Sequence, residues 1–202
     1  MKKIAVFASG NGTNFQAIID AVSAGKVKEG KVCVLACDNP EAFCLQRAKK
    51  AGIKTVVIER KNFDTKKKFE EEISKALKKE KIDLICLAGF MRILSTDFIK
   101  EYKDRILNIH PALLPSFKGA RAVKDALACG VKITGATVHF VTEELDNGPI
   151  IIQGAIKISP EDTEESLLEK VHSQEHEIYP RAIDLFCRDK LKITGRKVKI
   201  LE

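Results

Sequence analysis

The chain has no tryptophan and only two tyrosines, two methionines and four histidines among its 202 residues. No aromatic residues interleave with its lysine clusters, which argues against a surface that stacks nucleic-acid bases. No apolar run approaches the roughly 18 residues that a membrane-spanning helix needs. The opening Met1-Lys2-Lys3 leads into too few apolar residues for a signal-peptide core. These absences predict a cytoplasmic protein with neither nucleic acid nor a membrane as its partner.

The six cysteines are not arranged in any C-x-x-C pair. In an unexported chain such cysteines are by default reduced thiols. Cys33, Cys37 and Cys86 lie inside apolar runs, where a thiol behaves as a small hydrophobic side chain. We therefore expect neither a disulfide framework nor a metal site.

The net charge of +7 comes from 35 basic and 28 acidic side chains. The clusters Lys66-Lys67-Lys68 and Lys78-Lys79 alternate with glutamates, which is typical of the solvated side of a surface helix. A content of 45% hydrophobic and 31% charged residues is that of an ordinary globular protein. A basic surface attracts small anions such as phosphates and carboxylates, so the charge favours small-molecule substrates.

Strand and helix patterns alternate along the first 110 residues. The predicted strands are residues 3–8, 32–37, 55–58, 84–87 and 105–109. The predicted helices are residues 14–23, a second from Asn39-Pro40 to Gly52, 64–79 and a short one from Ser95. This alternation predicts a doubly wound α/β fold with a mainly parallel sheet.

The last third of the chain has a different pattern. Residues 132–141 and 149–158 are β-rich and flank Asn147-Gly148, a hairpin signal. Residues 190–201 are expected to form a short strand pair at the sheet edge. The sequence thus predicts antiparallel strands after the parallel part.

A long helix is predicted between these strands, up to about Phe186. Asp162, with Glu165 three residues on, is the expected N-cap. This final helix would pack on the sheet, and we expect residues 1–202 to form a single domain.

A glycine-rich loop, Ser9-Gly10-Asn11-Gly12-Thr13-Asn14, follows the first predicted strand and precedes a helix. Backbone N–H groups at a helix N-terminus bind anions, so a phosphate site is predicted here. No Gly-Lys-Ser/Thr ends the loop, which excludes a nucleoside-triphosphate loop. A dinucleotide fingerprint fits in part, because Phe15 replaces its third glycine while Asp38 matches its ribose-binding acid. A nicotinamide-dependent oxidoreductase therefore remains an alternative.

Two further loops follow predicted strands, where α/β sheets bind ligands. Residues 88–94 are apolar, with Gly89 allowing close approach, and are suited to a flat apolar ligand. Asn108 and His110 share one side of a strand because they are two residues apart. Such a pair can stabilise a developing oxyanion and move a proton. Asp146 is the candidate to orient the histidine, although spacing alone favours a plain turn aspartate.

Several motifs together resemble the folate-dependent phosphoribosylglycinamide formyltransferases, and they run in order over the whole chain. They are Ser9-Gly10-Asn11-Gly12-Thr13-Asn14-Phe15-Gln16-Ala17-Ile18, Leu87-Ala88-Gly89-Phe90-Met91-Arg92-Ile93-Leu94, Leu107-Asn108-Ile109-His110-Pro111 with Leu113-Leu114-Pro115, Val138-His139-Phe140-Val141-Thr142 through Leu145-Asp146 and Gly148-Pro149, and Gln174-Glu175-His176 with Ile178-Tyr179-Pro180.

The resemblance implies transfer of the formyl group of 10-formyltetrahydrofolate to the amine of 5-phosphoribosylglycinamide in purine biosynthesis, without a metal. It implies a nucleotide-binding part of about residues 1–110, a folate and catalytic part of about 111–202, a monomer or homodimer, and a cis Leu114–Pro115 bond. The implied roles are catalysis by Asn108, His110 and Asp146; phosphate and ribose binding by Gly12, Thr13, Asn14 and Glu175; and folate binding by Lys66, Met91, Arg92, Ile93, Leu94, Asn108 and Val141.

Two relatives share the Asn-x-His pattern. Methionyl-tRNA formyltransferase has an added C-terminal domain, and we expect this chain to lack one. Formyltetrahydrofolate hydrolase remains an alternative, because the three catalytic candidates alone do not separate hydrolysis from transfer. The phosphate loop at Gly10–Asn14 favours transfer. Arg121 and His172 depart from the family's usual residues.

Overall fold

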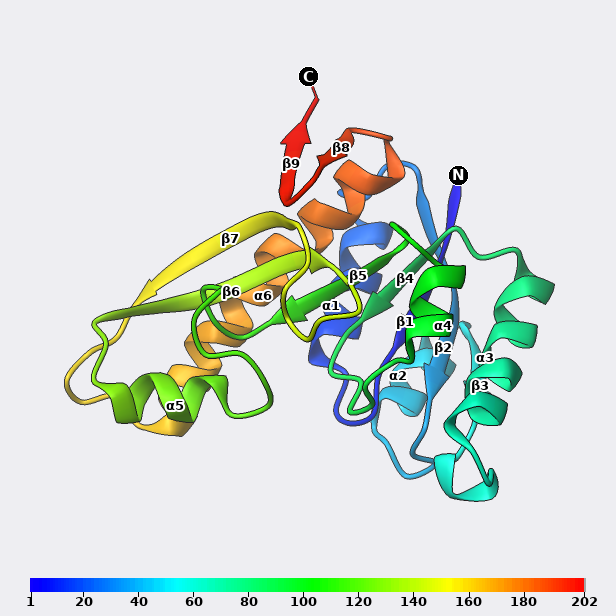
Figure 1. The fold of residues 1–202 in the computed structure, drawn as a ribbon, viewed down its shortest axis with the longest axis horizontal. Helices are drawn as coiled ribbons and strands as arrows, with labels where there is room; N and C mark the ends of the chain where they lie inside the picture. Colours follow the sequence, from blue (N-terminus) through cyan, green and yellow to red (C-terminus); the bar gives the residue numbers. More distant parts are fainter. Residues whose placement is uncertain (202) are drawn as a thin grey trace.

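In the computed structural model, which describes residues 1–201, one nine-stranded sheet runs through the molecule and carries helices on both faces (Figure 1). Its parallel half has the strand order β3-β2-β1-β4-β5. The bounds are β1 (Lys2–Phe7), β2 (Gly30–Cys37), β3 (Lys54–Val57), β4 (Leu84–Leu87) and β5 (Ile106–His110). The predicted doubly wound arrangement is confirmed.

The other half of the sheet is mostly antiparallel. Strand β6 (Ile133–Phe140) pairs antiparallel with both β5 and β7 (Ile150–Lys157). Strands β8 (Leu191–Thr194) and β9 (Lys197–Ile200) form the predicted terminal hairpin, which joins the sheet where β9 lies parallel to β7. The antiparallel C-terminal region is therefore confirmed as well.

The two faces of β1 bury alternate side chains in two cores. Ile4 and Val6 pack with helices α1 (Thr13–Ser23), α2 (Cys44–Lys50) and α6 (Glu164–Cys187). Ala5 and Phe7 pack with α3 (Lys66–Glu80) and α4 (Thr96–Glu101) on the opposite face. Each fully buried large aliphatic or aromatic side chain contributes about 1.5–3 kcal/mol of hydrophobic stabilisation. This burial on both sides explains the continuous apolar runs of the parallel strands.

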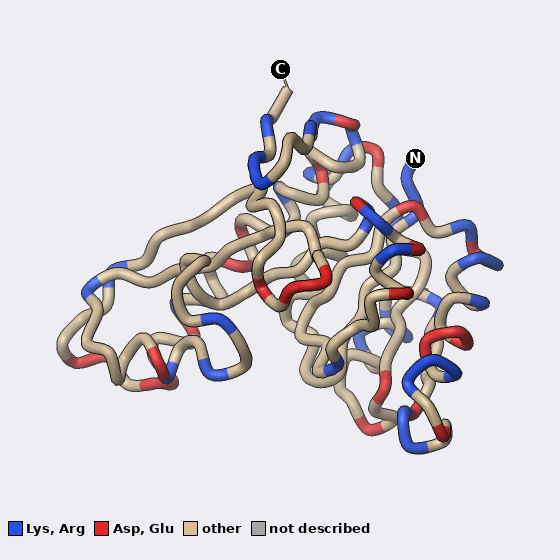
Figure 2. The backbone as a smooth tube through the Cα atoms, in the orientation of Figure 1, with Lys and Arg blue, Asp and Glu red and all other residues tan. Residues whose placement is uncertain are grey.

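The remaining helices lie outside these two layers. A 3₁₀ turn, η1 (Arg60–Asn62), precedes α3, whose exposed side interleaves basic and acidic residues as predicted (Figure 2). Helix α5 (Ala122–Cys129), which the sequence analysis did not predict, packs on α6 through Val123, Leu167 and Val171. Within residues 1–201, no helix has the length and apolar character to cross a bilayer.

Helix α2 begins later than predicted. The Asn39 side chain accepts a hydrogen bond from the Glu41 N–H at 3.0 Å, and the Asn39 carbonyl accepts one from Ala42 at 3.2 Å. This Asx turn uses Asn39-Pro40 to bend the chain, so the helix starts only at Cys44.

The N-cap of α6 is Thr163, not Asp162 as predicted. The Thr163 and Ser166 side chains bond each other's backbone N–H groups in a capping box, so Glu165 is not the partner. Asp162 instead forms an ion pair with Lys170 at 2.7 Å. The predicted N-cap is wrong by one residue. Asp and Thr are both good N-caps, so residue type alone does not select between them; the local course of the chain does.

Tyr179 joins α6 to the centre of the sheet. Its fully buried hydroxyl donates to the carbonyl of Leu87 at 2.9 Å and contacts that of Leu107 at 3.1 Å. Leu87 is the last residue of β4 and Leu107 lies near the start of β5, so the contact fixes the helix across these two neighbouring strands.

We expect Tyr179→Phe to lower the free energy of unfolding by about 1–3 kcal/mol, because it removes this buried hydrogen-bond donor. Tyr102→Phe is the matched control, since the Tyr102 hydroxyl is buried without a hydrogen-bond partner among the described residues. This control should be neutral or stabilising, because it removes a buried hydroxyl that makes no hydrogen bond among the described residues. Urea unfolding of both variants provides the measurement, and equal effects would contradict the role given to Tyr179.

Candidate active site

The loops after β1 and β4 meet at the point where the strand order reverses. The Ser9 N–H donates to the Gly89 carbonyl at 3.1 Å, and the Ser9 hydroxyl accepts from the Met91 N–H at 2.9 Å. Ligands of doubly wound sheets bind at this crevice. The glycine-rich loop and the apolar loop 88–94, both predicted from sequence, therefore line one site.

The glycine-rich loop has a backbone that requires glycine. Gly12 caps α1 with φ of 76°, in the left-handed region. A Cβ at Gly12 would lie 2.6 Å from the Cβ of Cys44. Arg47 holds the loop by donating to the carbonyl and side-chain oxygens of Asn11 at 2.9 and 2.8 Å. The sequence analysis missed Arg47, because this contact spans 36 residues and leaves no local pattern.

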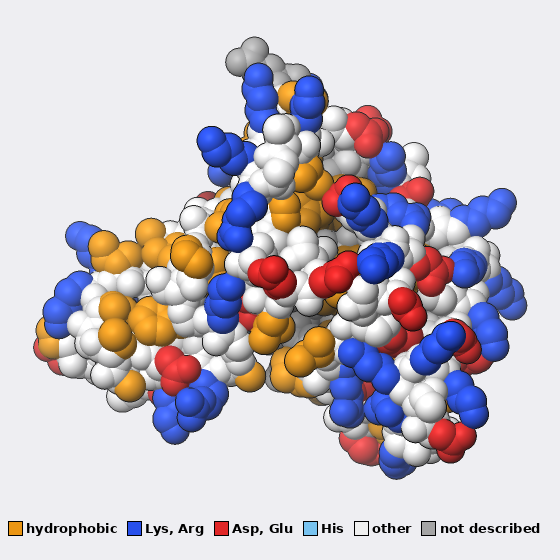
Figure 3. Space-filling model, viewed as in Figure 1, with side chains coloured by type: hydrophobic (Ala, Val, Ile, Leu, Met, Phe, Trp, Pro, Cys, Tyr) orange, Lys and Arg blue, Asp and Glu red, His pale blue; other side chains and the backbone are white. Residues whose placement is uncertain are grey.

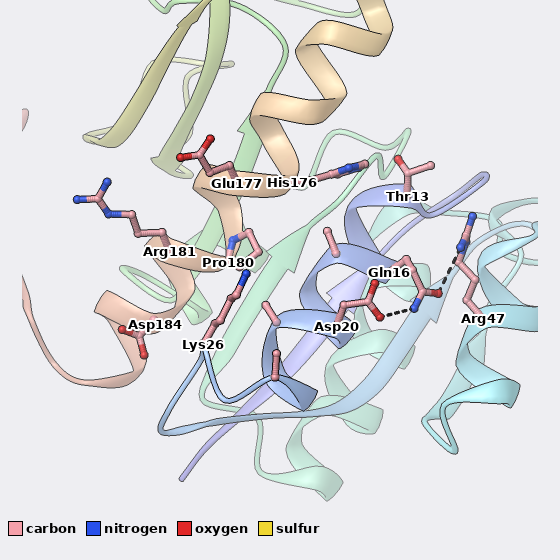
Figure 4. A pocket seen from close by; sticks show the side chains of 13 residues that line it. Thr13, Gln16, Asp20, Lys26, Arg47, His176, Glu177, Pro180, Arg181 and Asp184 are labelled. Atoms are coloured by element: carbon pink, nitrogen blue, oxygen red, sulfur yellow. Dashed lines mark hydrogen bonds between the residues drawn. The ribbon is translucent and has the colours of Figure 1, made fainter.

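A groove of about 760 Å³ opens beside the loop, between α1 and α6 (Figure 4). Thr13, Gln16, Arg47 and His176 gather at one end of it, and the His176 ring points toward Thr13 (Figure 4). The Nε2 atom of His176 is buried without a hydrogen-bond partner within residues 1–201. Burial lowers the pKa of His176 and of His172, whose ring stacks on it at 6.2 Å. This end of the groove therefore presents the Arg47 guanidinium and the Nε2 atom of a neutral-favouring His176 between the loop and α6.

Asn14 and Glu175, both predicted to bind substrate, meet in the structure. The Asn14 side-chain amide donates to the Glu175 carboxylate at 2.7 Å, although 161 residues separate them. Both are buried, and the Asn14 Oδ1 atom has no partner among the described residues. Burial raises the pKa of Glu175 to about 7, and the bond from Asn14 opposes that shift. Asn14 Oδ1 and the Glu175 carboxylate can therefore accept hydrogen bonds from a substrate hydroxyl.

Asn108 is oriented by His139, a residue that the sequence analysis quoted within a motif but gave no role. The two are opposite each other in the β5–β6 ladder, and Asn108 Nδ2 lies 3.2 Å from His139 Nε2. His139 Nδ1 lies 2.9 Å from the Phe140 carbonyl, so Nδ1 carries the proton and Nε2 accepts from the amide. Burial lowers the pKa of His139, which favours this neutral form. Pairing the two predicted strands that contain Asn108 and His139 was the signal that could have identified His139.

His110 and Asp146 are brought together in a nearly closed site. His110 Nδ1 lies 3.5 Å from Asp146 Oδ2, with side chains 5% and 8% exposed. The same carboxylate oxygen accepts from the Gly119 N–H at 2.9 Å. His110 Nε2 lies 2.8 Å from the Phe117 carbonyl, so Nε2 is a donor. The ring therefore lies between the Phe117 carbonyl and the Asp146 carboxylate, with one nitrogen facing each.

The loop predicted to bind folate presents apolar side chains to solvent. Met91 and Ile93 are 70% and 69% exposed, whereas Leu94 is buried. Val141 packs, partly buried, in the core beneath this loop. Hydrophobic side chains gather in the hollow between the two halves of the molecule (Figure 3). Exposed apolar groups clustered at a strand-end crevice are typical of a ligand site.

Arg92 and Lys66 are polar and do not belong to this cluster of exposed apolar side chains. Arg92 Nε lies 2.6 Å from a carboxylate oxygen of Asp38, whose side chain is only 4% exposed. Asp38, the candidate ribose acceptor of a nicotinamide enzyme, thus carries an ion pair through one of its two oxygens. Lys66 begins α3, is exposed, and makes no hydrogen bond or ion pair with the other candidate residues in the described chain.

The bond between Leu114 and Pro115 is cis, as the resemblance implied. The Leu114 N–H donates to the Thr137 hydroxyl at 3.1 Å, and its carbonyl accepts from Gln153 at 2.9 Å. The chain after His110 is therefore anchored to β6 and β7 before it continues to Phe117.

Glu175→Gln should change how stability depends on pH. The pKa of Glu175 is raised in the folded state to about 7. The protonated carboxyl therefore contributes to the stability of the fold in full below about pH 4.5, and this contribution is lost as the pH rises through about 7. We expect the variant to exceed the wild type by up to about 3 kcal/mol near pH 8 and to match it near pH 4.5. Urea unfolding at both pH values measures this, with exposed Glu177→Gln as the control. A pH-independent difference would contradict the assignment.

Three comparisons place the chain among known proteins. The family described as "Formyl transferase" matches residues 2–183. A phosphoribosylglycinamide formyltransferase from Bacillus subtilis is 43% identical over 183 residues, 91% of this chain and 93% of the relative. The crystal structure of glycinamide ribonucleotide transformylase 1 from Symbiobacterium toebii superimposes with a TM-score of 0.98 at 42% identity, covering 100% of this chain and 95% of that one.

Other relatives are longer than this chain. A trifunctional purine biosynthetic protein from Drosophila melanogaster is 46% identical over 184 residues, which are 90% of this chain but only 14% of that protein. A formyltetrahydrofolate deformylase from Pseudomonas syringae is a more distant neighbour, with a TM-score of 0.92 at 25% identity over 100% of this chain and 66% of that one. The predicted resemblance is confirmed: the chain belongs to the formyl transferase family.

Proposed function

We propose that the protein transfers the formyl group of 10-formyltetrahydrofolate to the amine of 5-phosphoribosylglycinamide. The relatives of similar length carry the corresponding name. The observation that carries the proposal is the buried contact of His110 with Asp146 at 3.5 Å, on the same sheet edge as the anion-binding loop.

The glycine-rich loop is the proposed site for the substrate phosphate. Gly12, Thr13 and Asn14 provide the start of α1, where free backbone N–H groups and the helix dipole favour an anion. Glu175 is proposed to accept from the ribose hydroxyls, and the unpartnered Asn14 Oδ1 beside it supports a hydroxyl-bearing ligand at this depth. The substrate's anionic end and its sugar would thus be held by α1 and α6 together.

Asn108 and His110 are proposed to stabilise negative charge that develops on the formyl oxygen. The Asn108 amide has two N–H donors, and only one is used by His139, so the other remains for the oxyanion. One such donor contributes about 3 kcal/mol to transition-state stabilisation. Asp146 is proposed to orient His110, which can donate to the oxygen and pass a proton to the leaving nitrogen.

Since Nδ1 of His110 faces Asp146, the donor available to a substrate is the Nε2–H group. In this structure the Phe117 carbonyl accepts from that group. For His110 to act on substrate, residues around Phe117 must move away. Phe117 has φ of 50°, an uncommon backbone conformation for this residue, which lowers the cost of leaving it.

The formyl donor is proposed to lie against the loop 88–94, with Lys66, Met91, Arg92, Ile93, Leu94, Asn108 and Val141 as its binding residues. When bound, 10-formyltetrahydrofolate supplies an activated formyl group. The exposed Met91 and Ile93 side chains suit its flat ring, and the Arg92 guanidinium, 48% exposed, suits a carboxylate. We propose a cytoplasmic enzyme that works on small molecules as a monomer or homodimer, without a metal.

Hydrolysis of the same donor is the second candidate, and an assay separates the two. Purified protein with both substrates should form formylated product and tetrahydrofolate together. Omitting 5-phosphoribosylglycinamide should stop the release of tetrahydrofolate. Release that continues without the amine would favour a hydrolase.

His110→Ala and Asp146→Ala should each lower kcat by about a hundredfold or more, the scale of a positioned acid–base group. Lys192→Ala, exposed on β8, is the control and should leave kcat unchanged. Steady-state kinetics provide the measurement. Rates near that of the wild type would remove the two residues from the mechanism.

His139→Leu should lower kcat by about 10- to 100-fold, because the Asn108 amide would lose the acceptor that orients it. His139→Gln retains an acceptor and should recover part of that loss. KM for both substrates should change little, since His139 acts through Asn108. A Gln variant as slow as the Leu variant would contradict this positioning role.

A further inference from the structure

Two thiols lie in contact beneath the glycine-rich loop. The Sγ atoms of Cys37 and Cys44 are 3.7 Å apart. Cys37 ends β2, Cys44 begins α2, and both side chains are buried. Neither residue takes part in the proposed transfer reaction.

We propose that Cys37 and Cys44 form a dithiol modification site, which a two-electron oxidant such as hydrogen peroxide converts to a disulfide that distorts the anion-binding loop. The predicted loss of affinity for the phosphate-bearing substrate rests on the function proposed above. Formation of the disulfide and its effect on inorganic phosphate do not.

The two thiols differ in acidity, which suits them to successive roles. A hydrogen bond from the Cys44 thiol lowers the pKa of Cys37 to about 7, whereas the same contact and burial raise that of Cys44. The Cys37 thiolate attacks peroxide, which breaks the O–O bond and gives a sulfenic acid and hydroxide. The Cys44 sulfur then displaces that hydroxyl as water. Overall two thiols and one peroxide give one disulfide and two waters.

We expect closing the gap between the two sulfurs to shift Cys44 more than Cys37. A disulfide is about 2.05 Å long, so sulfurs that start 3.7 Å apart must approach by roughly 1.6 Å. Cys37 is held in the sheet, where it pairs with Val57 and its carbonyl accepts from Ile58 at 2.9 Å. Cys44 lies at the end of a short connection, at the first residue of a helix. We therefore expect the start of α2, and not the end of β2, to change position.

Cys44 contacts the glycine-rich loop at two points. Its N–H donates to the Gly10 carbonyl at 3.1 Å. Gly12 packs so closely on it that an added Cβ would come within 2.6 Å of the Cys44 Cβ and 3.2 Å of its Cα. Since this packing leaves no slack, a displacement of Cys44 is passed directly to Gly10 and Gly12.

A short segment covers the thiols. Of residues 39–43, only Ala42 is buried, and the turn is closed by the two bonds to Asn39. Local opening of such a segment requires much less free energy than global unfolding. Peroxide can reach Cys37 in the open form, more slowly than it reaches the exposed Cys129.

Peptide mapping tests the chemistry. Cys129→Ser serves as the background, because it removes the exposed thiol. After peroxide treatment, cleavage at Glu41 separates the two cysteines, so a disulfide appears as two linked peptides that dithiothreitol releases. Cys44→Ala in the same background should give no linked peptides. Their absence from the peroxide-treated Cys129→Ser protein would overturn the proposal.

Coupling to the loop has two readouts. In a glutathione redox buffer at equilibrium, saturating inorganic phosphate should lower the disulfide fraction relative to chloride at equal ionic strength, because linkage between two sites is reciprocal. Oxidation should raise KM for 5-phosphoribosylglycinamide about tenfold, and KM for the folate by less than about twofold. A disulfide that forms without either effect would overturn the coupling. If the reduced protein transfers no formyl group, the proposed function fails, and the phosphate arm still decides this inference.

Discussion

The antiparallel register between β5 and β6 is the constraint on which the candidate site depends. It sets Asn108 opposite His139 and His110 opposite Thr137. The Asn108 amide is thereby directed by a ring from the neighbouring strand, and the loop after β6 returns Asp146 to His110. Because backbone hydrogen bonds fix this register, a slip of one residue would turn the whole set to the other face of the sheet.

Helix α6 connects the two ends of the site. Glu175 reaches α1 at the proposed phosphate-binding end, and Tyr179, one turn later, bonds the carbonyls of Leu87 in β4 and Leu107 in β5. A buried carboxyl whose pKa is near 7 is costly for folding, and such costs are typical of functional sites. The same helix that completes the core thus places one polar group against each half of the proposed substrate site.

Close packing under the glycine-rich loop limits how far that loop can move. Gly12 touches Cys44, and Arg47 from the same helix bonds Asn11, so α2 supports the loop from below and from the side. Binding of the proposed anion would therefore need little ordering of the loop, which would preserve affinity. The same rigidity makes the loop sensitive to any change in the position of α2.

The sequence by itself determined the α/β alternation, the strand positions, the glycine-rich loop before a helix and the shared side of Asn108 and His110, because these follow from periodicity and local residue type. The cap of α6 and the start of α2 were misplaced by a few residues, where neighbouring polar residues compete for the same backbone groups. Only the tertiary structure decided that Asp146 meets His110, that His139 orients Asn108 and that Arg47 and Cys44 support Gly12. Those contacts join segments about 30 or more residues apart, and strand pairing and packing, not any local pattern, bring them together.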